Sequence, residues 1–227
     1  MGRYAMLEAR DVSLSYGATQ ALRDVSLRVE DGASVALMGA SGSGKSSLLH
    51  CLAGVIVPDE GAVLIDGIDV TGLPDKDRSR FRLERMGVVF QFGDLVPELT
   101  LVENVMLPLQ LLGRRTKQAR SRARELLDLL GVADLADSRT GAVSGGQAQR
   151  AAVARAMVHE PRLVLADEPT GSLDSINAEA VLDALVDLTR GAGATLLVVT
   201  HDNVVASHLD TLVTLHDGRV LSAPVNV

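Results

Sequence analysis

A glycine-rich loop at residues 39–46 constrains this chain more than any other part of the sequence. It follows the pattern G-x-x-x-x-G-K-S, which is typical of a phosphate-binding loop. Glycine lets backbone amides crowd around an anion, Lys45 supplies a positive charge, and the Ser46 hydroxyl is a hard oxygen ligand suited to Mg²⁺. An apolar run at residues 33–38 predicts a buried parallel strand, and residues 47–53 predict a helix whose N-terminus faces the anion. This context favours phosphate binding over a chance match in a glycine-rich turn.

Composition limits the classes of protein to which the chain can belong. A length of 227 residues suits one medium domain with room for an inserted subdomain. The net charge of −7 disfavours a broad surface for nucleic acid. Cys51 is the only cysteine, and we expect it to pack as a small apolar residue without a redox role. No run approaches the roughly 18 apolar residues of a membrane span, so any membrane role must come through a partner.

The expected elements alternate as in an α/β protein, with one interruption. We expect strands at residues 7–15, 25–29, 33–38, 63–65, 87–90, 162–168, 195–200, 213–215 and 220–221. We expect helices at residues 47–53, 75–85, 116–130 and 145–159, and a last helix that follows residues 172–174 and ends at residue 190. A capping box of Thr100 and Glu103 predicts a further helix that starts at Leu101, and Pro108 should kink or end it. The opening strands indicate an antiparallel layer attached to a nucleotide-binding core. Residues 92–159 interrupt the α/β pattern and indicate an inserted helical subdomain.

Two acids close the apolar strand expected at residues 162–168. In this arrangement the first acid, Asp167, supports Mg²⁺, usually through water, and the second, Glu168, can polarise an attacking water. The alternative is a strand followed by an acidic cap. Lys45 and Ser46 upstream favour the first interpretation.

Four other features leave two interpretations open. Tyr16 either stacks on a base or is a partly buried surface ring. Ser144 is a plausible helix N-cap, and the two glycines after it form either a second anion site or a loop with its cap. His201, at the carboxyl end of a strand, contacts a ligand or is structural. The basic run at residues 114–124 is a solvated face, or it meets phosphates or lipid headgroups.

The order of these motifs resembles the ATP-binding cassette family over almost the whole chain. The correspondence covers Tyr16 with the adenine-stacking aromatic, residues 39–46 with Walker A, Gln91 with the Q-loop, residues 143–147 with the L-S-G-G-Q signature, residues 163–168 with Walker B, residues 172–174 with the D-loop and His201 with the switch histidine. Small departures from the family pattern occur at Ala40, Ser47 and Val143. None of them removes a required functional group.

The resemblance implies an ATPase that works as a head-to-tail dimer. ATP at one copy's phosphate loop would be covered by Ser144 and Gly146 of the other copy. Catalytic roles are implied for Glu168, His201, Gln91 and Lys45, and Mg²⁺ ligation for Ser46 and Gln91 with Asp167 in support. Glu168 would orient or deprotonate the attacking water, and His201 would contact the γ-phosphate. Nucleotide contacts are implied for Tyr16, Gly39, Ala40, Ser41, Gly42, Ser43, Gly44, Lys45, Ser46, Ser47, Ser144, Gly145, Gly146, Gln147 and Asp174.

The resemblance also implies the fold and the partners. We expect a single ABC ATPase domain over residues 1–227, an α/β protein with a RecA-like P-loop NTPase core. Residues 1–91 and 160–227 would form this core with its antiparallel β layer, and residues 92–159 the helical subdomain. The chain ends soon after its last strand, which suggests a stand-alone subunit. It would dock on a separate membrane permease through the helical block near Gln91, in the cytoplasm at the inner face of the cell membrane.

Within the family, two segments resemble the lipoprotein-release and macrolide-efflux branch. They are residues 166–175 and residues 97–105, together with the Phe90–Gln91 pair. Two other functions remain open. A soluble cassette acting on DNA or ribosomes would usually carry a long coiled coil or a second cassette, and neither is seen here. A cell-division cassette that drives a cell-wall hydrolase is scarcely separable by sequence.

Overall fold

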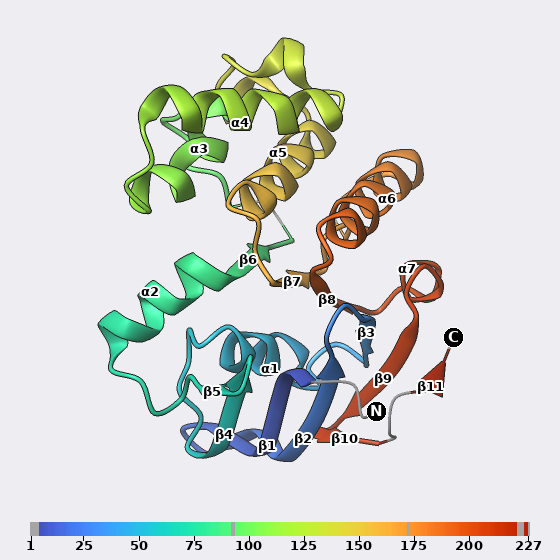
Figure 1. Cartoon of the computed structure of the whole chain (residues 1–227). Coiled ribbons are helices and arrows are strands. Elements are labelled where there is room, and N and C mark those ends of the chain that lie inside the picture. Colours follow the sequence, from blue (N-terminus) through green and yellow to red (C-terminus); the bar gives the residue numbers. More distant parts are fainter. Residues whose placement is uncertain (1–4, 92–93, 172, 222–224, 227) are drawn as a thin grey trace.

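The computed structural model describes residues 5–91, 94–171, 173–221 and 225–226. An antiparallel sheet has the strand order β2-β1-β4-β5 (Figure 1). Its strands are β1 (Ala5–Tyr16), β2 (Thr19–Glu30), β4 (Glu60–Ile65) and β5 (Ile68–Asp69). The separate antiparallel layer expected from the opening strands is therefore present.

A larger sheet has the order β10-β9-β3-β8-β7-β6, and β11 also pairs with β9. Its strands are β3 (Ser34–Met38), β6 (Met86–Val89), β7 (Leu163–Asp167), β8 (Thr195–Thr200), β9 (Thr211–His216), β10 (Arg219–Val220) and β11 (Val225–Asn226). β3, β6, β7, β8 and β9 run parallel, whereas β10 and β11 pair antiparallel with β9. The carboxyl ends of the parallel strands thus meet at one edge, where α/β proteins bind ligands.

The helices fall into two groups (Figure 1). α1 (Lys45–Leu52), α2 (Asp75–Arg85), α6 (Ser175–Gly191) and α7 (Asn203–Ser207) belong to the sheet-containing part. α3 (Leu101–Leu111), α4 (Thr116–Leu129) and α5 (Gly145–Met157), with short 3₁₀ turns at Ala133–Leu135 and Thr140–Ala142, form a helical block. The predicted α/β class, with a helical block interrupting the core, is confirmed. Phe92, at the boundary expected for this block, lies outside the described residues.

Two apolar cores explain why the strands of the larger sheet are apolar along their whole length. In β7, Leu163 and Leu165 pack into one core, whereas Val164 and Ala166 pack into the other. Successive strand residues point to opposite faces, so a sheet covered on both sides needs continuous apolar strands. The first core joins the two sheets around α1, and the second joins the larger sheet to α3, α4, α5 and α6.

Cys51 lies in the first core and is fully buried, as predicted. Burial raises the pKa of its thiol to about 11. The thiol therefore stays protonated at neutral pH and is a poor nucleophile.

Pro108 does not end α3, so that alternative of the prediction was wrong. The helix continues to Leu111, and the amide of Leu112 still donates to the Pro108 carbonyl at 3.0 Å. Proline removes only its own N–H, and the residues after it keep their donors. The start of α3 agrees with the sequence, because Thr100 and Glu103 form the predicted capping box.

The strand β6 passes close to α5 at Gly87. A Cβ added at Gly87 would lie 2.4 Å from the carbonyl oxygen of Ala156, a backbone atom that cannot rotate away. We expect Gly87→Ala to lower the free energy of unfolding by about 1–3 kcal/mol, the usual cost of overpacking. Gly141→Ala is the matched control, because a Cβ there meets nothing within 4 Å. Urea denaturation measures both variants, and equal midpoints would contradict the close contact.

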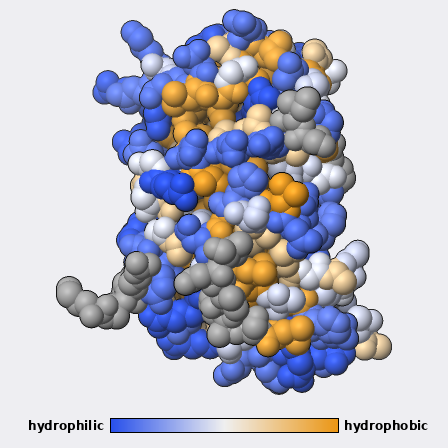
Figure 2. All heavy atoms as spheres, turned by 90° about the vertical axis from the view of Figure 1, so that its right-hand side faces the viewer, coloured by the Kyte–Doolittle hydropathy of each residue, from blue (hydrophilic) through white to orange (hydrophobic). Residues whose placement is uncertain are grey.

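The face on the right-hand side of Figure 1 is largely hydrophilic, with separate apolar patches (Figure 2). In the described part of the chain, no helix combines the length and the apolar character needed to cross a bilayer.

Candidate functional site

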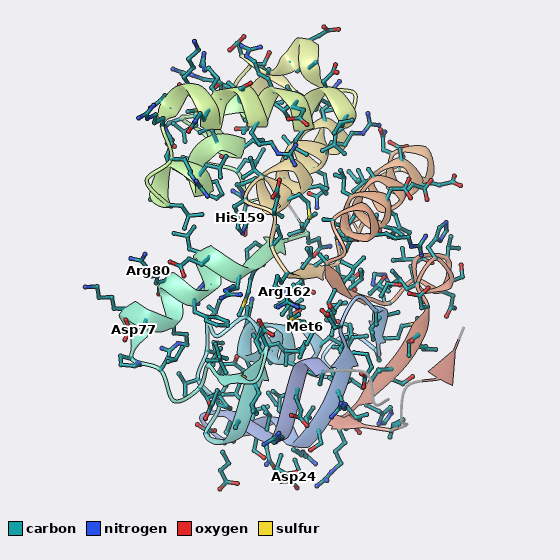
Figure 3. The ribbon with its side chains drawn as sticks, in the orientation of Figure 1. Met6, Asp24, Asp77, Arg80, His159 and Arg162 are labelled. Atoms are coloured by element: carbon teal, nitrogen blue, oxygen red, sulfur yellow. The ribbon has the colours of Figure 1, made fainter. Side chains whose placement is uncertain are left out.

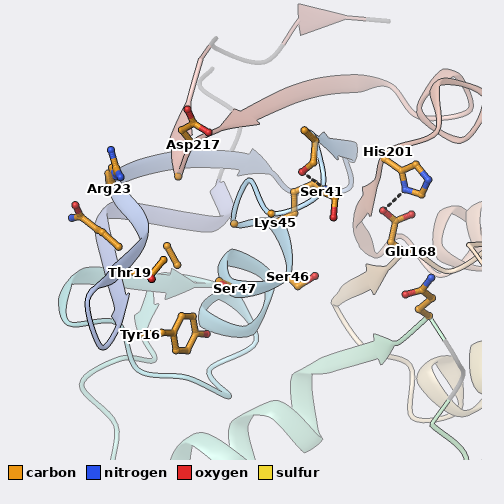
Figure 4. A pocket seen from close by; sticks show the side chains of 17 residues that line it. Tyr16, Thr19, Arg23, Ser41, Lys45, Ser46, Ser47, Glu168, His201 and Asp217 are labelled. Carbon is orange, nitrogen blue, oxygen red and sulfur yellow. Dashed lines mark hydrogen bonds and ion pairs between the residues drawn. The ribbon is translucent and has the colours of Figure 1, made fainter.

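An open cleft of about 950 Å³ lies at the carboxyl edge of the larger sheet (Figure 4). The β1–β2 hairpin, the phosphate loop, the start of α1 and the β9–β10 turn contribute to its walls, together with residues that follow β6, β7 and β8. Its lining consists of Tyr16, Thr19, Gln20, Ala21, Arg23, Ala40, Ser41, Gly42, Gly44, Lys45, Ser46, Ser47, Gln91, Glu168, His201, Asp217 and Gly218.

The phosphate loop is held in a fixed shape by its own lysine. Lys45 is buried, and its Nζ donates to the carbonyl oxygens of Gly39 at 2.8 Å and Ala40 at 3.0 Å. Gly39 has no room for a side chain, because a Cβ would lie 2.2 Å from the Leu215 carbonyl oxygen. The helix α1 begins at Lys45, two residues earlier than predicted, and Gly44 before it offers no side-chain cap. Its first amides are therefore left to bind an anion.

Ser46 and Asp167 form the candidate metal site. The Ser46 hydroxyl hydrogen-bonds the Asp167 carboxylate, and the Asp167 Oδ1 atom is buried without a hydrogen-bond partner among the described residues. Burial raises the pKa of Asp167, and the Ser46 hydrogen bond opposes this shift. A hydroxyl and an unpartnered carboxylate oxygen are hard ligands, which fit Mg²⁺. No cluster of three or more His, Cys, Asp or Glu that could hold a metal occurs in the described ranges, and Mg²⁺ at nucleotide sites takes its other ligands from phosphate and water.

We expect Asp167→Asn to raise the melting temperature of the nucleotide-free protein at neutral pH. The raised pKa means that the ionised carboxylate is less stable in the folded than in the unfolded state, so ionisation costs stability above the usual carboxyl range. The difference from wild type should shrink as the pH falls and Asp167 becomes protonated. Asp187→Asn, at an exposed position on α6, is the control. Thermal unfolding followed by circular dichroism tests this, and a lower melting temperature for Asp167→Asn at neutral pH would contradict it.

Glu168 and His201 meet because β7 and β8 are parallel neighbours. Glu168 follows β7, and its Oε1 atom lies 2.7 Å from the Nδ1 atom of His201, which follows β8 (Figure 4). The Thr200 hydroxyl donates to the other carboxylate oxygen at 3.5 Å. The backbone of Glu168 has φ +45, and its amide donates to Val199. A strained residue held by its neighbours at a cleft is a common feature of active sites.

Gln91 lies in the cleft directly after β6 and Phe90, next to the chain that follows Glu168. A Cβ built on Gly171 would lie 2.9 Å from the Gln91 Nε2 atom. Two side chains of α5 hold the segment around Gln91: Gln149 donates to the Phe90 carbonyl at 2.9 Å, and Arg155 donates to the Asp94 carbonyl at 2.7 Å. These hydrogen bonds therefore link the helical block to the end of the cleft that contains Glu168.

Ser144 and Asp174 cap two helices that lie side by side. Ser144 forms a capping box with Gln147 at the start of α5, and Asp174 caps α6. Gly146 lies against Asn177 of α6, where a Cβ would be 3.0 Å from the Asn177 side chain.

None of the signature residues is among those that line the cleft. Ser144 therefore acts as a helix cap, and Gly145 and Gly146 do not line the cleft that contains the phosphate loop. Ser172, part of the predicted D-loop, lies outside the described residues.

Tyr16 is half exposed at the end of the cleft remote from Glu168 (Figure 4). Thr19, Gln20 and Arg23 also line the cleft and were not predicted, although their position just after Tyr16 in the hairpin was a usable signal. The Asp217–Gly218 turn also lines the cleft and was not predicted. Gly218 donates to the Ser43 carbonyl at 3.0 Å and accepts from the Arg23 amide at 2.8 Å. These are long-range contacts for which no local pattern exists.

A phosphate loop at the carboxyl edge of a parallel sheet, with a hydroxyl–carboxylate pair beside it, defines a P-loop nucleotide-binding protein. The profile of the ABC transporter family matches residues 22–171, and the chain belongs to this family. It is an ATP-binding cassette ATPase.

Several relatives are similar over nearly their whole length. An uncharacterised ABC transporter ATP-binding protein of Mycobacterium tuberculosis is 43% identical, with 98% of this chain and 92% of the relative covered. The lipoprotein-releasing system ATP-binding protein LolD of Bacteroides fragilis is 40% identical, covering 95% of this chain and 100% of the relative. LolD of Hyphomonas neptunium is 42% identical, with 90% of each chain covered.

Among solved structures, a dimeric post-hydrolysis state of the ATP-binding cassette MJ0796 bound to ADP and Pi has a TM-score of 0.91. It is 37% identical, and the match covers 97% of this chain and 98% of that chain. The predicted family and fold class are therefore confirmed.

Proposed function

We propose that the chain is the nucleotide-hydrolysing subunit of a membrane complex of the lipoprotein-release and macrolide-efflux type. It closes as a head-to-tail dimer on ATP and Mg²⁺ and drives a separate membrane partner. The relatives named LolD and the dimeric structures of MJ0796 support the branch and the assembly.

In the proposed mechanism, the chain's own residues supply position and charge. Lys45 and the loop amides bind the outer phosphates, and Glu168 orients the attacking water and takes its proton as a general base. His201 holds the Glu168 carboxylate and is placed to reach the γ-phosphate. Ser46, Gln91 and Asp167 would hold Mg²⁺, which when bound supplies positive charge at the β- and γ-phosphate oxygens. Tyr16 would stack on the adenine.

We infer the dimer because the signature residues do not line the nucleotide cleft of their own copy. Ser144 and Gly145 are exposed at the start of α5 and Gln147 is half-buried, yet neither these residues nor the buried Gly146 line any part of the cleft that contains Lys45. A second copy related by a two-fold axis would bring each signature to the other's cleft. The site is then complete only between two copies, and Asp174, beside the signature, joins the same interface.

A second cleft, of about 210 Å³, is the proposed docking cleft for the membrane partner. It lies between α2, β6, the end of α3 and α5, and its lining includes Ser79, Pro108, Arg155 and His159. His159 lies between α5 and α2 (Figure 3). Arg155 also donates to the Asp94 carbonyl beyond Gln91. A partner seated in this cleft would therefore sense movement at Gln91. Because this partner is a membrane protein, the chain would work at the inner face of the cell membrane.

A photo-crosslinker attached to Ser79→Cys tests this function. The only native thiol, Cys51, is buried and stays unlabelled. We expect an integral membrane protein of the same cells to be captured, with a yield that changes between ATP and ADP. The same reagent on Ser26→Cys, on the exposed side of β2, is the control. Capture of ribosomes or nucleic acid, or equal capture from both positions, would contradict the proposal.

A further inference from the structure

A cluster of positive charge surrounds the turn between α3 and α4. Residues 104–124 contain six Lys or Arg side chains and no acid, although the whole chain has a net charge of −7. We call Leu111, Arg114, Arg115 and Lys117 the basic turn; all four side chains are exposed.

The cations of the basic turn differ from those further along α4, because they have no ion-pair partner among the described residues. Further along α4, Arg122 pairs with Glu125 and Glu160, and Arg124 with Asp137. In the described part of the chain, no carboxylate lies within the 4.0 Å ion-pair distance of Arg114, Arg115 or Lys117. The solvated-face alternative therefore accounts for the paired half of α4 but leaves the basic turn without a role.

The basic turn lies on the side of the proposed docking cleft. Pro108 lines that cleft. Leu111 is three residues further along α3, which is about 4.5 Å along the helix axis from Pro108. Figure 1 places the α3–α4 turn and α2 on the same side of the molecule. A membrane protein seated in the cleft would bring this turn toward the bilayer.

We propose that the basic turn contacts the anionic headgroups of the membrane in which the partner is embedded. This inference rests on the proposed function, because the docking cleft sets which side faces the bilayer. Arg114, Arg115 and Lys117 attract the negative surface, and Leu111, 65% exposed, adds an apolar contact at the headgroup boundary. The contact orients the cassette beneath its partner.

The test is sedimentation of the purified full chain with vesicles that contain no membrane protein. Vesicles of phosphatidylcholine with about a third phosphatidylglycerol are compared with pure phosphatidylcholine. The triple variant R114Q/R115Q/K117Q is compared with the matched control R10Q/R190Q/R219Q. The control removes the same charge from exposed arginines that are paired with Glu8, Asp210 and Asp24.

We expect the wild type and the control to bind the anionic vesicles, and the basic-turn variant to lose about a hundred-fold in partitioning, about five-fold for each cation. Salt near 1 M should abolish the binding, because the Debye length falls to about 3 Å. Equal losses in both triple variants, equal binding to neutral vesicles or no wild-type binding would overturn the inference.

Crosslinking from Ser79→Cys, repeated in both triple-variant backgrounds, separates this inference from the proposed function. Retained capture with lost vesicle binding leaves both proposals standing. Lost capture with retained vesicle binding would assign the basic turn to the partner protein and overturn the lipid contact. If Ser79→Cys captures no membrane protein in any background, the docking proposal fails independently of the vesicle result.

Discussion

Glu168→Gln should lower the rate of ATP hydrolysis by about 100- to 10,000-fold, the range expected when a general base is removed. The carboxylate lies at the carboxyl end of β7, 2.7 Å from His201, in the cleft that holds Lys45 and Ser46. Glutamine keeps a hydrogen-bonding oxygen at this position but cannot take a proton. ATP binding should therefore survive, and an ATP-bound dimer should accumulate because the step that opens it is blocked.

Phosphate release at saturating ATP, nucleotide binding and light scattering in ATP and in ADP measure these three effects. Glu98→Gln, at an exposed position before α3, is the matched control and should behave as wild type. Near-normal turnover in Glu168→Gln would remove Glu168 from its proposed role. Full loss of ATP binding would indicate that the substitution had disturbed the loop instead.

Ser144→Arg should lower hydrolysis by about 100- to 1,000-fold, comparable to the loss of a key donor to a developing charge. Ser144 is exposed at the start of α5 and lies outside its own copy's cleft. An arginine there would block the approach of the second copy's phosphates without touching the loop that binds ATP. Single-site ATP binding should remain near wild type, and no dimer should form with ATP.

Two further variants separate the block from other effects of the substitution. Ser144→Ala removes the cap, which costs about 1 kcal/mol of stability, but leaves the approach open. It should still form the ATP-bound dimer, and its hydrolysis should fall less than that of Ser144→Arg, because it loses only the hydroxyl contact. Ser121→Arg adds the same charge at an exposed position of α4 and should be silent. Cooperative hydrolysis by Ser144→Arg at the wild-type rate would refute a site completed by the second copy.

The parts of the fold that were predictable are those with strong local signals. Apolar runs located the strands at residues 33–38 and 195–200, and the capping box located the start of α3. The expectation that Pro108 ends α3 was wrong because it considered only the local effect of proline. It left out the packing of α3, whose buried face includes Met106. α7 was missed because five residues are too short for a helical period to be read.

The candidate site was predictable in its residue types but not in its geometry. Family resemblance pointed to Glu168 and His201, whereas their direct contact depends on β7 and β8 being neighbours. The links from Gln149 and Arg155 to the segment around Gln91 join residues about 60 positions apart. No sequence pattern encodes such contacts, because they arise only when the helical block packs against the core.

The most direct test of the account is a structure of the Glu168→Gln protein with ATP and Mg²⁺ bound. We predict two copies, each with ATP between its own Lys45 and the Ser144 hydroxyl and Gly146 amide of the other, within hydrogen-bond distance of a phosphate oxygen. A structure in which every phosphate contact comes from a single copy, with both signature segments turned to solvent, would contradict the account.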